Sequence, residues 1–153
     1  MAGKTPITDK TRPPLIFSAH LKATPQAVFD AFFRDATRWL CRESSVDAQV
    51  GGDLRMCWPD GCYVGRFVQC EPPVTARFSW QMEGDALPAT MVVVRADPVP
   101  SSDHTAFELE HYGFGAGPDW DLLYLSATRA WAAYLKNLKA FIEAGLDLRE
   151  ADE

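Results

Sequence analysis

The stretch Pro118–Ala144, PDWDLLYLSATRAWAAYLKNLKAFIEA, decides the fold because it predicts one long helix with an apolar side that needs a partner. Apolar residues recur every three or four positions along it, which is the spacing of one helical face. Pro118 suits a first helical turn, and Gly145 stands where a left-handed C-cap is expected. Such a helix is about 40 Å long, so we expect an extended, curved sheet to cover it.

The rest of the chain supplies strands for that sheet. Alternation of apolar and polar residues predicts strands at 15–21, 53–58, 62–71, 75–82, 90–97 and 105–112. Pro59-Asp60-Gly61 has the composition of a hairpin turn. Thr24-Pro25 begins a short helix that ends near Phe33, and a second helical turn holds Trp39 and Leu40. We therefore predict an α+β fold, in which a curved antiparallel sheet of about six or seven strands wraps around the long helix.

Length and composition predict one globular domain. The chain has 153 residues, of which 47% are apolar and 24% charged. We expect residues 1–13 to be a flexible lead-in, 14–149 a single domain and 150–153 a frayed acidic tail. The net charge of -6 argues against a nucleic-acid partner. Without a membrane span or a signal peptide, we expect a soluble cytoplasmic protein, monomeric or homodimeric.

The four cysteines, Cys41, Cys57, Cys62 and Cys70, are predicted to be reduced thiols in the core. They would permit two disulfides in a secreted domain, but they fall on buried or strand positions without a CxxC pair. Cys57 and Cys62 flank a turn without a nearby histidine, which argues against zinc. We expect no metal and no cofactor.

Several short stretches, taken in order, resemble the SRPBCC (START-like) superfamily. They are Ala23–Ala31, Arg38–Leu40, Gly51–Arg55, Asp60-Gly61, Gly65, Pro72-Pro73, Phe78–Trp80, Leu109–Phe114 and Trp131–Leu138. Within it the sequence is most similar to single-domain bacterial homologues of the activator of the heat-shock protein 90 ATPase. The resemblance covers Leu15 to about Arg149 and implies the helix-grip (START-like/Bet v-like) fold, with a hydrophobic cavity between sheet and long helix. It implies no single activity, because members include lipid carriers, cyclases and chaperone activators.

Residues on the predicted inward faces suggest a small-molecule pocket. Aromatic walls with a few polar groups are typical of such pockets, although the same rings also fill cores. The predicted ligand-binding residues are Trp39, Met56, Trp58, Phe78, Trp80, Val92, Val94, Phe107, Leu109, His111, Phe114, Trp120, Leu123, Tyr124 and Ala127. We expect the loop 113–117 to be a lid with Phe114 as its plug. The N-terminal half of the long helix should line the pocket, and the half from Trp131 to Ile142 should pack as core.

His111 is the candidate for chemistry, because alternation with Phe107 and Leu109 places it on the apolar face. A neutral imidazole there could bind a ligand or act as a general base, with Tyr124 or Tyr112 as a hydrogen-bond donor. The alternative is a core histidine that neighbouring groups satisfy. Motifs for a nucleophile, a metal or a nucleotide are absent from the sequence, so we favour binding over catalysis.

We therefore expect a protein that binds a small hydrophobic or aromatic molecule, or a lipid, between the sheet and the long helix. Two alternatives stay open. One is a chaperone-activator-like interaction module of the stress response, with a chaperone as its partner. The other is a cyclase- or hydrolase-type enzyme that uses the cavity histidine.

Overall fold

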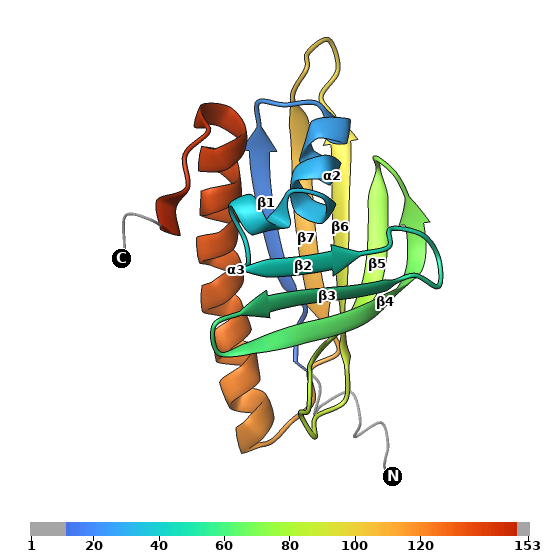
Figure 1. The fold of residues 1–153 in the computed structure, drawn as a ribbon, viewed down its shortest axis with the longest axis vertical. Helices are drawn as coiled ribbons and strands as arrows, with labels where there is room; N and C mark the ends of the chain where they lie inside the picture. The colour runs from blue at the N-terminus through green and yellow to red at the C-terminus, as the bar shows by residue number, and fades with distance from the viewer. Residues whose placement is uncertain (1–11, 150–153) are drawn as a thin grey trace.

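Seven strands form one antiparallel sheet around one long helix in the computed structural model, which describes residues 12–149 (Figure 1). The elements are β1 (Leu15–Leu21), α2 (Pro25–Phe33), the 3-10 turn η1 (Ala36–Arg38), β2 (Glu43–Val46), β3 (Asp53–Trp58), β4 (Gly61–Glu71), β5 (Thr75–Met82), β6 (Thr90–Pro98), β7 (Thr105–Tyr112) and α3 (Pro118–Ala144). The strand order is β1-β7-β6-β5-β4-β3-β2. The predicted helix-grip architecture is confirmed. The expected tail 150–153 and most of the expected lead-in lie outside the described residues.

Two elements differ from the prediction. β2 is not among the strands that alternation predicts, because its sequence ESSV is short and largely polar, yet it pairs with β3 at the edge of the sheet. The second short helix is a single 3-10 turn that ends at Arg38. Trp39 and Leu40 follow it and are fully buried, so their packing matters more than their helical propensity.

α3 packs one face into the concave side of the sheet. Its buried side chains are Ala127, Trp131, Leu135, Asn137 and Leu138. Pro118 occupies the first turn, and Gly145 adopts the left-handed conformation with φ 69°. The Gly145 N–H donates to the Phe141 carbonyl at 2.9 Å, which satisfies a carbonyl of the last helical turn. Both predicted ends are therefore confirmed. No helix within residues 12–149 is long and apolar enough to cross a membrane.

The sheet bends within β4, so that the first half of the strand, with Gly61 and Tyr63, lies across α3. A Cβ at Gly65 would lie 1.8 Å from the Ser79 carbonyl oxygen, so only glycine permits this approach to β5. The register also shifts between Phe67 and Gln69, as in a β-bulge. In Figure 1, β2, β3 and β4 consequently run across the direction of β1, β6 and β7.

Cys57 and Cys62 form a disulfide, so the expectation of reduced thiols is wrong for this pair. The two residues stand directly opposite each other in the β3–β4 ladder, because the turn between Trp58 and Gly61 sets the register. Trp58 pairs with Gly61 next to the turn, so the next pair outward along the two strands is Cys57 with Cys62. Cys41 and Cys70 are free. Burial raises the pKa of Cys41 to about 11, which keeps its thiol protonated at neutral pH.

Residues at both ends of the described chain hold α3 in place. Arg12, which we predicted in the lead-in, forms an ion pair with Asp121 of α3. At the other end, Arg149 donates to the carbonyls of Cys41 and Thr37, each at 3.0 Å. Arg149 also pairs with Asp147, with 2.8 Å between Nη2 and Oδ2. The C-terminal segment therefore ties α3 to the chain around η1.

The Asp147 carboxylate should make stability depend on pH. Hydrogen bonds from Arg149 lower the pKa of Asp147 to about 2, below the value of about 3.9 for an unfolded aspartate. Its stabilising effect is therefore full above pH ~4 and is lost as the pH falls toward 2. We expect Asp147→Asn to lower the free energy of unfolding by about 1 to 2 kcal/mol at neutral pH.

Urea denaturation between pH 7 and pH 2.5 measures this effect, with Asp103→Asn in an exposed loop as the control. The gap between wild type and Asp147→Asn should shrink as the pH falls below 4. A gap of constant size across this range would contradict the assignment.

Candidate functional site

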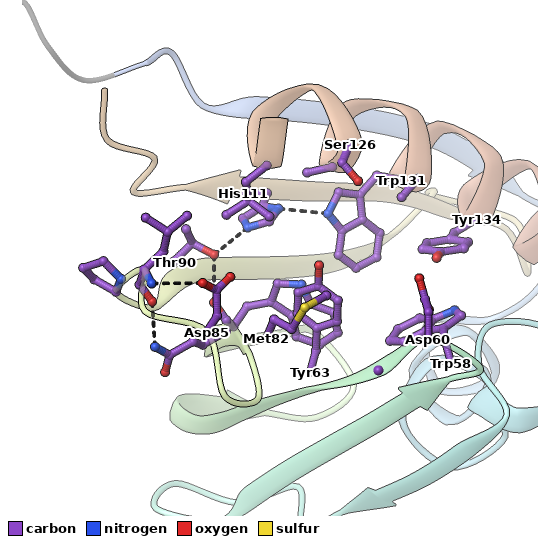
Figure 2. A pocket seen from close by; sticks show the side chains of 18 residues that line it. Trp58, Asp60, Tyr63, Met82, Asp85, Thr90, His111, Ser126, Trp131 and Tyr134 are labelled. Carbon is purple, nitrogen blue, oxygen red and sulfur yellow. Dashed lines mark hydrogen bonds between the residues drawn. The ribbon is translucent and has the colours of Figure 1, made fainter. Parts of the chain in front are cut away.

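A cavity of about 180 Å³ lies between the sheet and the middle of α3 (Figure 2). Strands, the β3–β4 turn, the β5–β6 loop and α3 all contribute to its wall. The lining residues are Trp58, Asp60, Gly61, Tyr63, Trp80, Gln81, Met82, Asp85, Leu87, Pro88, Thr90, His111, Leu123, Ser126, Ala127, Ala130, Trp131 and Tyr134. An engineered cavity of about 150 Å³ binds benzene, so a one-ring molecule fits this volume.

Five aromatic side chains of the wall form a closed ring of contacts. The ring-centroid distances are 5.8 Å for Trp58–Tyr63, 4.9 Å for Tyr63–Trp80, 5.8 Å for Trp80–Trp131, 5.8 Å for Trp131–Tyr134 and 5.7 Å for Tyr134–Trp58. The two stacked pairs are Tyr63–Trp80 and Trp58–Tyr134, and the other contacts are tilted or edge-on. Such pairs contribute about 0.5 to 1.5 kcal/mol each beyond area burial. We call these five residues the aromatic ring of the cavity.

The aromatic ring joins three parts of the fold. Trp58 and Tyr63 come from the β3–β4 hairpin, Trp80 from β5, and Trp131 and Tyr134 from α3. Residues three apart on a helix lie on one face, which explains why the two α3 side chains reach the same cavity. The Trp58 indole is also fixed from behind, because its Nε1–H donates to the Leu40 carbonyl at 2.9 Å.

A chain of hydrogen bonds through His111 connects α3 to the sheet (Figure 2). The Trp131 Nε1–H donates to His111 Nδ1 at 2.9 Å. An indole can only donate, so the neutral imidazole carries its proton on Nε2. His111 Nε2 then donates to Thr90 Oγ1 at 2.7 Å, and that hydroxyl donates to the Trp80 carbonyl at 2.9 Å. Each donor and each acceptor in this series of hydrogen bonds therefore has a defined partner.

The surroundings of His111 favour a structural role over that of a general base. Its side chain is buried, with 1% exposed, and burial lowers its pKa to about 3. The nitrogen that could accept a proton already accepts the Trp131 N–H. Tyr124, its predicted partner, donates instead to the Pro13 carbonyl at 3.1 Å.

The predicted ligand-binding residues separate into two groups. Five line the cavity, namely Trp58, Trp80, His111, Leu123 and Ala127. The others lie away from it, in the hydrophobic core (Trp39, Met56, Phe78, Val92, Val94, Phe107 and Leu109) or near the start of α3 (Phe114, Trp120 and Tyr124). The chain therefore uses most of its inward aromatic and aliphatic residues as core.

Phe114 fills the space beside the start of α3, so the cavity lies at the middle of the helix. Its side chain is buried, and its ring lies 4.5 Å from His111 and 5.0 Å from Tyr124. A Cβ at Gly115 would lie 2.6 Å from the Trp120 indole nitrogen, so this glycine lets the loop pack tightly on α3. The first turns of α3 are therefore packed by the loop, and Trp131, which we predicted as core, lines the cavity instead.

Several lining residues were not predicted, and the sequence contains information on the inward position of only some of them. Tyr63 stands opposite Met56 in the β3–β4 ladder, so counting register from the turn would have placed it on the inward face. Asp60 and Asp85 lie in turns, where hydrophobic periodicity gives no direction for a side chain. Among residues 12–149, no group of three His, Cys, Asp or Glu side chains is arranged to hold a metal ion.

A family model described as activator of Hsp90 ATPase homolog 1-like protein matches residues 22–143. The chain belongs to this family. The resemblance predicted from the sequence is thus confirmed. A comparison with curated proteins finds no match.

Solved structures share the fold of this family member. CalU16 from Micromonospora echinospora is 25% identical, with 86% of this chain and 77% of that chain covered and a TM-score of 0.68. An HSP90 activator from Plasmodium falciparum is 21% identical, with 84% and 94% covered and a TM-score of 0.70. The Aha1 dimer from Colwellia psychrerythraea is 20% identical, with 88% and 98% covered and a TM-score of 0.72.

We expect His111 to stay a neutral Nε2–H tautomer from pH 8 to pH 5, because its pKa is lowered to about 3 and Trp131 donates to Nδ1. ¹⁵N NMR of the imidazole ring measures this directly. Trp131→Phe should shift the Nδ1 resonance, since it removes the donor, whereas Trp120→Phe should leave it nearly unchanged. A titration of wild-type His111 near the ordinary value of about 6.5 would contradict the assignment.

Proposed function

We propose that this protein binds a compact aromatic or apolar molecule in the cavity between the sheet and α3. The observation that carries the proposal is the closed aromatic ring at a cavity of about 180 Å³. Ligand pockets are typically lined by apolar and aromatic groups with a few polar ones. Rigid aromatic side chains can surround a planar ligand with little further loss of conformational freedom, because each has only two rotatable side-chain angles.

The volume narrows the class of ligand. Sites for drug-sized molecules occupy about 300 to 1,000 Å³, and this cavity is smaller. It is close to the size of the engineered cavity that holds benzene. The proposal is therefore for a molecule with one ring, and it disfavours a two-chain lipid.

The buried polar groups of the wall are already occupied within the protein. Thr90 and His111 bond each other, and Gln81 Nε2 donates to the Leu87 carbonyl at 2.7 Å. No buried side-chain nitrogen or oxygen of residues 12–149 lacks a hydrogen-bond partner. A ligand consequently need not satisfy a buried donor or acceptor, so shape and ring contacts would dominate recognition in the buried part of the cavity.

A matched pair of α3 variants tests the proposal. Ala130 lines the cavity, whereas Ala133 is exposed on α3. We expect a one-ring aromatic compound to bind the wild type saturably and to raise its Tm. Ala130→Phe should weaken binding at least 10-fold because the new ring occupies the cavity, and Ala133→Phe should leave it within two-fold.

Tryptophan fluorescence and thermal shift measure binding in this pair, and circular dichroism checks the fold of each variant. Failure of a panel of one-ring compounds to bind the wild type saturably would overturn the proposal. Equal affinity of wild type and a folded Ala130→Phe would place binding elsewhere and also count against it.

A second candidate function is an interaction with an Hsp90-type chaperone, which the match to the family model favours. It predicts that the protein raises the ATPase rate of the chaperone. Ala130→Phe should retain such stimulation, because it alters the cavity and not the surface. No change in ATPase rate at a ten-fold excess of the protein would remove this candidate.

A further inference from the structure

The charged side chains at the cavity wall are all acidic. Of the 18 residues that line the cavity, Asp60 and Asp85 are acidic and none is lysine or arginine. His111 is neutral, since burial keeps its pKa low. Figure 2 shows Asp60 beside Trp58 and Tyr134 at one end of the cavity, and Asp85 beside Thr90 at the other end. The wall therefore combines aromatic faces with uncompensated negative charge.

Neither carboxylate has an ion-pair partner within residues 12–149. Nearby acidic residues of β3 and of the β5–β6 loop do have partners. Arg66 pairs with Asp53 at 3.2 Å, and Arg55 pairs with Glu83 at 3.0 Å. The arginines of the hairpin are thus engaged with other carboxylates. Asp85 Oδ1 accepts the Leu87 N–H at 3.2 Å, but the negative charges of Asp60 and Asp85 stay available to a ligand.

The two carboxylates lie close enough to the aromatic ring to affect it. Burial raises the pKa of Tyr63, and the charges of Asp60 and Asp85 raise it further. Burial also raises the pKa of Tyr134 to about 12, with Tyr63 and Asp60 among the further causes. A group placed among these rings therefore experiences a negative potential from both turns.

Aromatic faces themselves attract cations. The ring quadrupole favours a positive charge within about 6 Å of the centroid, most strongly over tryptophan, and cages of this kind hold quaternary ammonium groups. Three of the five members of the aromatic ring are tryptophans, namely Trp58, Trp80 and Trp131. The aromatic faces and the carboxylates would thus both favour a positively charged ligand.

We propose that the cavity selects a cationic ligand, a protonated or quaternary ammonium group attached to a compact apolar or aromatic body. This inference rests on the proposed function and specifies the ligand's charge. An anionic ligand would meet two carboxylates without a basic side chain of the wall. A neutral ligand would gain the ring contacts alone.

Two probes of nearly identical shape test the inference, because they differ only by a positive nitrogen in place of a carbon. They are phenyltrimethylammonium and tert-butylbenzene. We expect the cation to bind the wild type at least 10-fold more tightly in tryptophan-fluorescence titrations. Asp60 and Asp85 are exposed, so salt screens their charges. Raising the salt concentration from 50 to 500 mM should therefore lower the affinity for the cation and leave the affinity for the neutral probe unchanged.

The double variant Asp60→Asn/Asp85→Asn should lower the affinity for the cation at least five-fold. Its affinity for tert-butylbenzene should stay within two-fold of the wild-type value. Asp103→Asn is the matched control, since Asp103 lies in the β6–β7 loop, at the opposite end of the molecule from the β5–β6 loop (Figure 1). It should leave both affinities unchanged.

The outcomes separate this inference from the proposed function. Equal affinity for both probes, or a cation affinity that the double variant does not change, would overturn the cationic preference while the cavity remains a binding site. If neither probe binds the wild type, the proposed function falls together with the inference.

Discussion

The hydrogen-bond chain from Trp131 through His111 and Thr90 to the Trp80 carbonyl is the constraint on which the site depends. Each of these groups is buried, and a buried donor or acceptor left unpaired costs about 1 to 3 kcal/mol. All the bonds form together only when α3 has one rotation and one distance from the sheet. The rings of α3 and of the sheet are consequently held facing each other, and the helix cannot move inward to fill the cavity without breaking the chain.

Much of this architecture could be predicted from the sequence, because periodicity reports which face of an element is buried. The apolar stripe gave α3 and both of its ends, and alternation gave six of the seven strands. What periodicity does not report is which residue lies opposite which. The disulfide between Cys57 and Cys62 and the inward position of Tyr63 both follow from hairpin register.

The candidate site was harder to predict than the fold for a physical reason. Inward residues of a sheet and helix look alike in sequence, whether they pack as core or border a cavity. Phe114 decides the difference here, because it packs against the start of α3 and displaces the cavity toward Tyr134. Asp60 and Asp85 lie in turns, and only the folded chain brings them to the same wall. Family membership fixes the fold, whereas the ligand has to be argued from these side chains.

The most direct test is a crystal structure of the protein soaked with 4-bromophenyltrimethylammonium, in which the bromine gives an anomalous signal. The account predicts one anomalous peak inside the cavity, with the ammonium within about 6 Å of the aromatic centroids and directed toward Asp60 or Asp85 at one end of the cavity. A cavity that stays empty, or is filled by protein side chains, while the compound binds elsewhere would contradict it.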